Sequence, residues 1–285
     1  MSAMTSGSRP VSVVVPAHNE AAGIGRLLDL LASGQPEDRV EVIVSCNGCT
    51  DDTATIARTF PGVVVVEIAQ ASKRLAMQAA DEVARHGVRA YLDADVTVSR
   101  HDVLTLVDAL HDRTIATAPE RRLVLDASSW VVRWYYDVWQ RLPQVRDGLF
   151  GRGLIVLSPE GYERVHGLPL VMSDDLAISE AFGSEERRVV PGTVAVIEAP
   201  RGVHDLLRRR IRIATGNSQL DDLGMRSVEA RTSTSDLVHI ASGSPRLVVR
   251  VAVFAAVSLA GRVLARRRIK RADYTTWLRD ESSRR

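Results

Sequence analysis

Two acidic side chains stand one residue apart in Asp93-Ala94-Asp95, directly after the apolar run Val88–Leu92. A short apolar run of this kind is typical of a buried strand. Carboxylate oxygens are the ligands that Mg²⁺ and Mn²⁺ prefer, and such an ion can bridge the oxygens of a diphosphate. Asp95, assisted by Asp93, is therefore a candidate metal site, although the same triplet also occurs in solvated surface turns.

The elements that must position these residues follow from the hydrophobic pattern. Apolar runs predict four strands in the first half, at Val11–Val15, Val40–Val44, Val63–Ile68 and Val88–Leu92. Between them, apolar residues recur at helical spacing, and Ser72 is suited to cap the third helix. This β-α alternation predicts an α/β fold with a parallel, doubly wound sheet that binds ligands at the carboxyl ends of its strands.

The second half of the chain is less regular. Its patterns predict the following elements in order: an aromatic-rich helix over Ser128–Leu142, a strand over Phe150–Leu157, a short helix after Ser158-Pro159, a helix over Asp174–Phe182, one or two strands within Val189–Ile197, a basic helix over His204–Gln219, a polar loop over Met225–Gly243 and a long helix over Leu247–Arg271. Gly151 and Gly153 would allow either a close approach of a sugar to the backbone or a tight bend.

Polar residues also follow the first two strands, in Pro16-Ala17-His18-Asn19-Glu20 and in Ser45–Thr53. Neighbouring strand ends form one rim of the ligand crevice in such a sheet. These segments are therefore suited to contact a nucleotide base and ribose. The same residues are also ordinary turn and helix-capping residues, and the two roles are compatible.

Taken in order, these segments resemble the family-2 glycosyltransferases, in which a P-x-x-N-E turn precedes D-D-G-S-T-D-x-T and later D-x-D. The matching segments are Pro16–Glu20, Cys46–Thr53 and Asp93–Asp95, and Ser72–Ala80 is similar to a G-K-x-x-A-L-N-x-G stretch. The resemblance covers roughly the first 110 residues. It implies the GT-A fold, a divalent metal (Mg²⁺ or Mn²⁺) and a nucleotide-diphosphate sugar as donor.

The resemblance predicts which residues bind the donor, because they match the family motifs or the basic stretch downstream of them. They are Pro16, Ala17, His18, Glu20, Cys46, Asn47, Lys73, Asp93, Ala94, Asp95, Arg209 and Arg212. Where the family often has an Asp that reads uracil, this chain has Cys46. This departure puts a uridine donor in doubt and leaves guanosine and thymidine donors open. Gln78 replaces the usual Asn of the family.

The resemblance also implies a general base, because an acidic pair opens a helix in the second half of the family. Asp175 is the expected base and Asp174 the alternative. An inverting transfer needs a carboxylate on the acceptor side to take the hydroxyl proton. Without the resemblance, helix capping explains both residues equally well, since Asp favours the first turn of a helix.

Arg208–Arg212 resembles the basic motif that covers the diphosphate in the family. The planar guanidinium pairs well with phosphate oxygens. The Trp of the processive motif is missing, so we do not expect a polymer synthase. His204 is a further metal ligand by hypothesis, but a single His is more often structural.

Composition and charge set the remaining expectations. The formal net charge is +2, but Arg246–Arg285 holds 11 Lys/Arg against 3 Asp/Glu, a net of +8. The basic tail suits an anionic membrane surface, or is a solvated helix end, and it could equally pack on the domain or dimerise. We expect no nucleic-acid partner, no signal peptide and no spanning helix, and therefore a cytoplasmic protein that is able to rest on the inner face of the membrane. Cys46 and Cys49 form the chain's only cysteine pair and are interpreted as reduced structural thiols.

These observations divide the chain into four parts: a flexible N-terminus over 1–10, a nucleotide-sugar-binding half over 11–118, an acceptor half over 119–224, and a polar loop with a basic helix over 225–285. The predicted function is inverting, metal-dependent glycosyl transfer. Its acceptor would be the hydroxyl of a cell-envelope polysaccharide, a glycolipid or a small glycoside. The alternatives are a nucleotidyltransferase, which usually has a Gly-rich phosphate loop after the first strand, and a degenerate GT-A scaffold. The oligomeric state does not follow from the sequence.

Overall fold

The computed structural model describes residues 9–31 and 39–270. These residues divide into two compact units. The first lies within Met1–Arg122, Arg152–Leu168 and Phe182–Ile197, and the second within Leu123–Gly151, Pro169–Ala181 and Glu198–Arg285. Residues 1–8 of the predicted flexible N-terminus and residues 271–285 of the basic tail lie outside the described residues.

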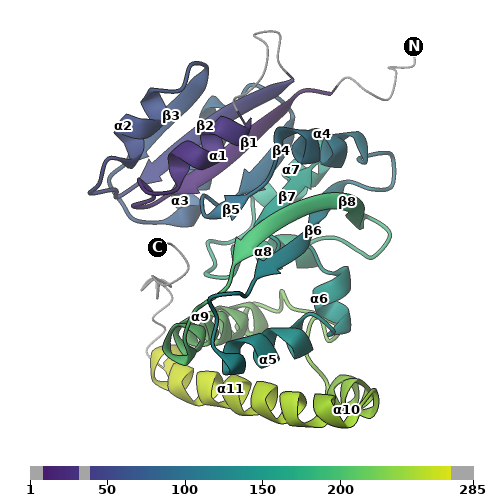
Figure 1. Ribbon diagram of the computed structural model, residues 1–285. Coiled ribbons are helices and arrows are strands. Elements are labelled where there is room, and N and C mark those ends of the chain that lie inside the picture. The colour runs from purple at the N-terminus through teal and green to yellow at the C-terminus, as the bar shows by residue number, and fades with distance from the viewer. Residues whose placement is uncertain (1–8, 32–38, 271–285) are drawn as a thin grey trace. The chain divides into compact units, whose positions relative to one another are not determined.

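The first unit begins with the predicted alternation of strands and helices (Figure 1). Its elements are β1 (Val11–Ala17), α1 (Ile24–Leu31), β2 (Val40–Asn47), α2 (Thr53–Arg58), β3 (Val63–Ile68), α3 (Lys73–Val83), β4 (Val88–Leu92), β5 (Val96–Thr97) and α4 (Arg100–Asp108). β1 pairs in parallel with β2 and with β4, and β2 pairs in parallel with β3. The four strands predicted from the sequence are therefore confirmed, as is the cap of α3 at Ser72; Ser99 caps α4 in the same way.

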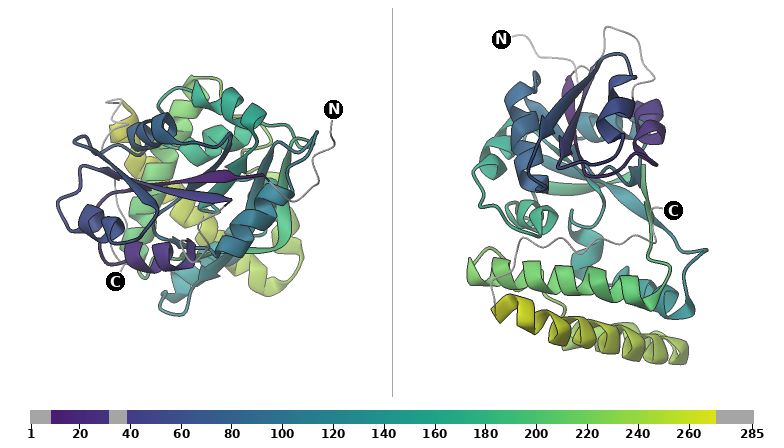
Figure 2. Two further views of the ribbon diagram at one scale, coloured as in Figure 1. Left: turned by 90° about the horizontal axis from the view of Figure 1, so that it is seen from above. Right: turned by 90° about the vertical axis from the view of Figure 1, so that its left-hand side faces the viewer.

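The sheet continues through strands that return to it from later in the chain. Its order is β3-β2-β1-β4-β7-β6-β8-β5, with β6 (Ala116–Val124), β7 (Leu154–Leu157) and β8 (Arg187–Glu198). β7 is antiparallel to both β4 and β6, so the eight-stranded sheet is mixed but mostly parallel in its first half. Seen from above, α1 and α4 lie on one face, and α3 and α7 (Pro159–His166) lie on the other (Figure 2, left).

Three predictions for these strands differ from the structure. β7 covers only the last four residues of the predicted strand Phe150–Leu157, because Gly151 and Gly153 adopt positive φ angles of 64° and 70° and form a turn instead. Of the one or two short strands predicted within Val189–Ile197 the structure has one, and at 12 residues it is longer than predicted. β6 was not predicted, because its sequence, ATAPERRLV, has no apolar run.

The core of the first unit explains why β1 and β2 lie at its centre. All seven residues of β1 and all eight of β2 are buried, which suits strands covered on both faces. The buried carboxylate of Glu41 accepts hydrogen bonds from Ser12 Oγ and from Arg85 Nε at 2.5 Å and 2.6 Å. Burial alone raises the pKa of Glu41, but the bonds from Ser12 and Arg85 outweigh it and lower the pKa below its usual range.

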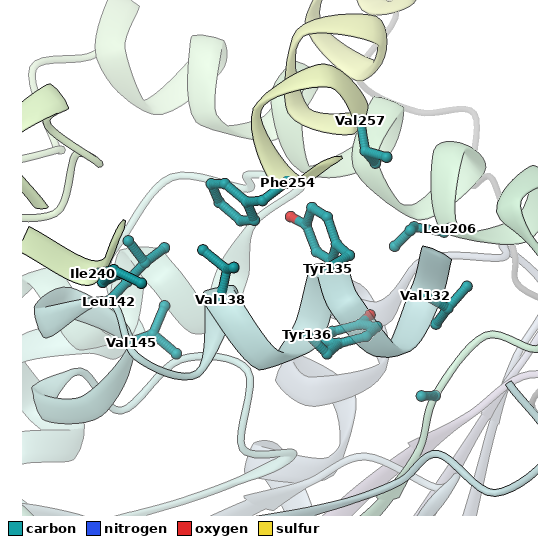
Figure 3. Packing of buried hydrophobic residues seen from close by; sticks show 11 residues of the cluster. Val132, Tyr135, Tyr136, Val138, Leu142, Val145, Leu206, Ile240, Phe254 and Val257 are labelled. Carbon is teal, nitrogen blue, oxygen red and sulfur yellow. The ribbon is translucent and has the colours of Figure 1, made fainter. Parts of the chain in front are cut away.

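The second unit is mainly helical, with α5 (Trp130–Trp139), α6 (Pro143–Asp147), α8 (Asp174–Glu180), α9 (Val203–Asp222), α10 (Thr234–Ser242) and α11 (Pro245–Lys270). α5, α9 and α11 lie side by side (Figure 2, right). Their shared core contains Tyr135, which stacks on Phe254 with ring centroids 4.9 Å apart (Figure 3). Most aromatic residues of α5 therefore pack, although Trp130 is 54% exposed.

Two expectations for the end of the chain need correction. Met225–Gly243 is not all loop, because Ser233 and Asp236 form a capping box that starts α10. α11 matches the predicted long helix. By length and composition, however, it is long and apolar enough to cross a membrane, whereas the sequence analysis expected no spanning helix. It is the one such helix among residues 9–31 and 39–270, and 22% of its most apolar window is buried.

Candidate active site

The loops after β1 and β2 are held together at one edge of the sheet. Parallel neighbours end at the same edge, and Ala17 and Cys46 are register partners there. His18 Nδ1 lies 2.6 Å from the carbonyl oxygen of Asn47, and Asn47 Nδ2 donates to the carbonyl oxygen of Ala17 at 2.8 Å. The predicted donor residues Ala17, His18 and Asn47 are thus brought into direct contact.

Asn19 and Glu20 continue this network toward α2. Asn19 adopts a left-handed φ of 51°, which places its Oδ1 to accept from the backbone N–H of Thr50 at 2.7 Å. The backbone N–H of Glu20 donates to Thr53 Oγ1 at 2.8 Å. Hydrogen bonds from Thr53 and from the backbone of Ala21 lower the pKa of Asp51 despite the opposing effect of burial. These side chains therefore support the loop, as their capping chemistry predicts.

The two cysteines lie inside this loop structure as free thiols. Cys46 is 1% exposed, and burial together with the neighbouring Cys49 raises its pKa to about 12. Cys49 is half-buried; its Sγ donates to the carbonyl oxygen of Ala17 and accepts from the backbone N–H of Asn19, both at 3.4 Å. The thiols thus take part in the packing of the β1 and β2 loops.

Asp93-Ala94-Asp95 forms a turn directly after β4, as predicted. The backbone N–H of Asp93 donates to the carbonyl oxygen of Gly153 at 2.8 Å, which fixes the start of the turn. Ala94 is buried, whereas the Asp93 side chain is 41% exposed and Asp95 is exposed. The two carboxylates therefore project away from the core while the residue between them anchors the turn.

Lys73 links α3 to this turn. Ser72 caps the helix by accepting from the backbone N–H of Leu75, which makes Lys73 the first helical residue. Its Nζ lies 2.7 Å from Asp93 Oδ1. On the other side, the Cα hydrogen of Gly48 faces the backbone of Ala71, where a Cβ would lie 3.0 Å from the Ala71 nitrogen. The start of α3 is thus in contact with the β2 loop and with the β4 turn.

This arrangement fits a divalent ion whose remaining coordination positions are filled by substrate phosphates. Asp93 and Asp95 supply hard oxygen donors, and Asp93 already accepts one cation, the ammonium of Lys73. Among the residues that the structure describes, this turn included, no group of three or more His, Cys, Asp and Glu side chains is placed to hold a metal ion by itself. Two carboxylates with substrate phosphates are a common ligand set for Mg²⁺.

The predicted catalytic acids lie in the second unit, at the start of α8. Asp174 is buried and Asp175 is half-buried. Asp175 Oδ2 accepts from the backbone N–H of Gly151 at 2.8 Å, and its Oδ1 accepts from the backbone N–H of Leu176 at the same distance. Ser173 is the N-cap residue of α8, but its side chain makes no capping hydrogen bond. The partnership between Gly151 and Asp175 has no signal in the sequence beyond the glycine itself.

α9 brings the predicted arginines toward the start of α8 within the same unit. Gly216 packs so closely against Ser173 that a Cβ would lie 3.1 Å from the Ser173 nitrogen. Arg209 and Arg212 are seven and four residues earlier on α9 and therefore lie on the same face as Gly216. Arg209 Nη1 donates to the hydroxyl of Tyr136 at 3.1 Å, a contact that the sequence did not reveal. The His204 side chain is 81% exposed and 3.7 Å from Asp205 Oδ1.

Comparison with known proteins finds similar sequences and similar folds. Residues 12–151 match the family described as glycosyl transferase family 2. The 4,4'-diaponeurosporenoate glycosyltransferase of Staphylococcus aureus strain USA300 is 32% identical over 108 residues. That alignment covers 35% of this chain and only 28% of the relative.

Solved structures share the fold along most of the chain. A mannosyltransferase from Pyrobaculum calidifontis, solved with GDP-Man and Mn²⁺, is 22% identical with a TM-score of 0.66, covering 93% of this chain and 88% of that one. Glucosyl-3-phosphoglycerate synthase from Mycobacterium tuberculosis, solved with Mn²⁺, UDP and glucosyl-3-phosphoglycerate, is 20% identical with a TM-score of 0.52, covering 80% and 87%.

The mixed sheet and the similarity to solved structures show the GT-A fold, and the family match within it is to glycosyl transferase family 2. Within that fold, residues 12–151 of this chain carry the glycosyl transferase family 2 domain.

Replacing Gly153 by Ala should destabilise the protein by about 2–4 kcal/mol, because φ is positive and a Cβ would overlap Val96. Gly62→Ala is the matched control, since Gly62 has a φ of 81° with open space around it and should cost only about 1 kcal/mol. Chemical denaturation measures both. Equal losses would show that the contact with Val96 is unimportant.

Iodoacetamide at about pH 8 should label Cys49 much faster than Cys46, since only the thiolate reacts. At that pH, Cys46 is protonated, because its pKa is about 12, and it is also buried. Mass spectrometry of the native protein should find one labelled cysteine, and of the denatured protein two. Rapid labelling of Cys46 in the native protein would contradict the packing of the β2 loop.

Proposed function

We propose that this protein transfers a sugar, with inversion at its anomeric carbon, from a nucleotide diphosphate to an acceptor hydroxyl. The observation that carries this proposal is the position of Asp93 and Asp95 at the carboxyl end of β4, with Lys73 Nζ 2.7 Å from Asp93. Two carboxylates and a lysine at the crevice edge of an α/β sheet suit a diphosphate and its metal ion. The family match over residues 12–151 supports the same chemistry.

Asp95 and Asp93 would hold Mg²⁺ or Mn²⁺. When bound, such an ion neutralises the negative charge that develops on the departing nucleotide diphosphate. Lys73, at the first turn of α3, is within reach of the same charge through its contact with Asp93. The neighbouring structures from Pyrobaculum and Mycobacterium both contain Mn²⁺, which supports a divalent metal.

The loops after β1 and β2 would recognise the nucleotide. Pro16 and Ala17 are the last two residues of β1 and are followed by His18 and Glu20 in its loop, and Cys46 and Asn47 are the last two residues of β2. Cys46 is a protonated, buried thiol and therefore lacks the charge of the Asp that often reads uracil in the family. We accordingly propose a guanosine or thymidine donor in preference to a uridine donor.

Asp175 is the proposed general base, with Asp174 as the alternative. Two backbone N–H groups bind the carboxylate of Asp175, one on each oxygen, which hold the side chain in one orientation. A carboxylate held in this way is suited to accept a hydroxyl proton as a general base. Asp174 is buried, and this favours Asp175.

Arg209 and Arg212 of α9 would stabilise phosphate oxygens, because a guanidinium stays charged and offers paired donors. The hydroxyl of Tyr136 orients Arg209. The acceptor, whether a cell-envelope polysaccharide, a glycolipid or a small glycoside, contributes only a hydroxyl to this scheme. We place the reaction in the cytoplasm, where nucleotide sugars are made.

A nucleotidyltransferase is the less favoured alternative, since the loop after β1 reads Pro16–Glu20 rather than a Gly-rich phosphate loop. A degenerate scaffold is disfavoured because Asp93, Asp95, Asp174 and Asp175 are all present. Both alternatives predict no release of free nucleotide diphosphate from a sugar donor.

Asp95→Asn should abolish metal-dependent nucleotide binding. In thermal-shift measurements with UDP, GDP, dTDP and CDP, one nucleotide should raise the Tm of the native protein only in the presence of Mn²⁺ or Mg²⁺. Asp112→Asn is the matched control, because Asp112 is an exposed carboxylate of the same unit that lies outside the loops after β1, β2 and β4. A metal-dependent shift that survives in Asp95→Asn would refute the assignment of the metal site.

Asp175→Asn should lower the rate of sugar transfer by about 10²–10⁴-fold while leaving nucleotide binding unchanged. The amide keeps an acceptor oxygen but cannot take the hydroxyl proton. Release of the nucleotide diphosphate from labelled donor measures the rate, and thermal shift measures binding. If Asp174→Asn instead loses transfer activity while Asp175→Asn stays active, Asp174 is the general base and Asp175 is not.

A further inference from the structure

α11 carries an uncovered apolar face that the transfer reaction does not use. Val248, Leu259 and Val263 are 53%, 58% and 45% exposed. Leu259 and Val263 follow Val248 by 11 and 15 residues, which places all three on one side of the helix over about 22 Å. The residues between them on that side, Ala252 and Ala256, are also exposed. A continuous apolar stripe of this length is unusual on a protein surface and marks an interaction site.

The opposite face of α11 is held by the second unit along its length. Phe254 stacks on Tyr135 (Figure 3), and Arg250 forms an ion pair with Asp137 of α5 at 2.6 Å. Gly261 packs against Arg210 of α9, where a Cβ would lie 2.8 Å from the Arg210 Cβ. α9 is rich in charged residues and cannot lie in hydrocarbon. α11 therefore does not cross a bilayer in this arrangement but offers one side to a surface.

The charge of α11 identifies the kind of surface. Beyond Val263, the same side continues with the exposed residues Arg266, Arg267 and Lys270. No Asp or Glu occurs between Pro245 and Lys270. An apolar stripe that ends in a basic turn matches the boundary of an anionic bilayer, where acyl chains lie beneath negative headgroups.

We propose that the outer face of α11 docks in the plane of an anionic lipid membrane. The apolar side chains enter the acyl boundary, and the basic turn contacts the headgroups.

A second copy of the chain fits this face less well than a lipid surface. A parallel pair of α11 helices would bring the two basic turns together. An antiparallel pair would bring each basic turn to the N-terminal end of the partner's α11, which holds Arg246. Neither arrangement supplies a negative charge from α11, so both would bring like charges together.

Cosedimentation of the full chain with vesicles tests the proposal. Binding should be strong to phosphatidylcholine vesicles containing about 30% phosphatidylglycerol, weak to pure phosphatidylcholine, and reduced by about 0.5 M NaCl. Leu259→Gln/Val263→Gln and Arg266→Gln/Arg267→Gln should each lower the partition coefficient by about tenfold or more. Donor-nucleotide binding and the Tm should stay near those of the native protein, which shows that the variants are folded.

Matched controls distinguish binding through this face from nonspecific hydrophobic or electrostatic binding by the rest of the protein. Val83→Gln/Val228→Gln removes two exposed apolar side chains elsewhere, and Arg113→Gln/Arg122→Gln removes two exposed charges elsewhere; neither should change vesicle binding. No binding to the anionic vesicles, or equal binding to neutral ones, would overturn the proposal. A dimer in light scattering that Leu259→Gln/Val263→Gln dissociates would assign the face to a second copy. Resistance of the bound protein to extraction by alkaline carbonate would indicate insertion instead.

Discussion

The parallel pairing of β1 with β2 and β4 is the constraint on which the donor side of this protein depends. Parallel strands that lie next to one another must end at the same edge, so residues that are about 30 and 75 positions apart in the chain meet there. The contacts of His18 with Asn47 and of Lys73 with Asp93 then add little more than local adjustment. The buried valines of β1 and β2 provide the rigidity, and the polar loops provide the chemistry.

The parts of the fold that the sequence predicts are those in which an element's own residues decide its structure. The four predicted strands, the cap at Ser72 and the position of Asp93–Asp95 directly after β4 belong to this group. β6 does not, because Pro119, Glu120 and the two arginines after it have no strand pattern and become a strand only through pairing with neighbours. Within the candidate site, motif residues were predictable, whereas partners such as Tyr136 for Arg209 and Gly151 for Asp175 come from tertiary packing.

The turn at Gly151–Gly153 illustrates why such contacts escape a linear pattern. Its two glycines suggest either a bend or a ligand contact, and the positive φ angles show the bend. The bend places a backbone N–H of Gly151 on Asp175 and a carbonyl oxygen of Gly153 on the backbone of Asp93. The chain passes from one unit to the other at this same point. Backbone groups thus set the orientation of both acidic motifs, and a backbone group carries no signature of its own in the amino-acid sequence.

The close packing of α9 has an evolutionary consequence. Gly216 leaves no room for a side chain beside Ser173, and Gly261 of α11 leaves none beside Arg210. α9 is therefore packed on two sides through contacts that have no room for a larger residue. These contacts fix both its position and its rotation about its own axis. We expect lineages that inherit this scaffold to diversify by exchanging the side chains that project from α9 and the loops around it. Adaptation to new acceptors would then leave the helical framework itself unchanged.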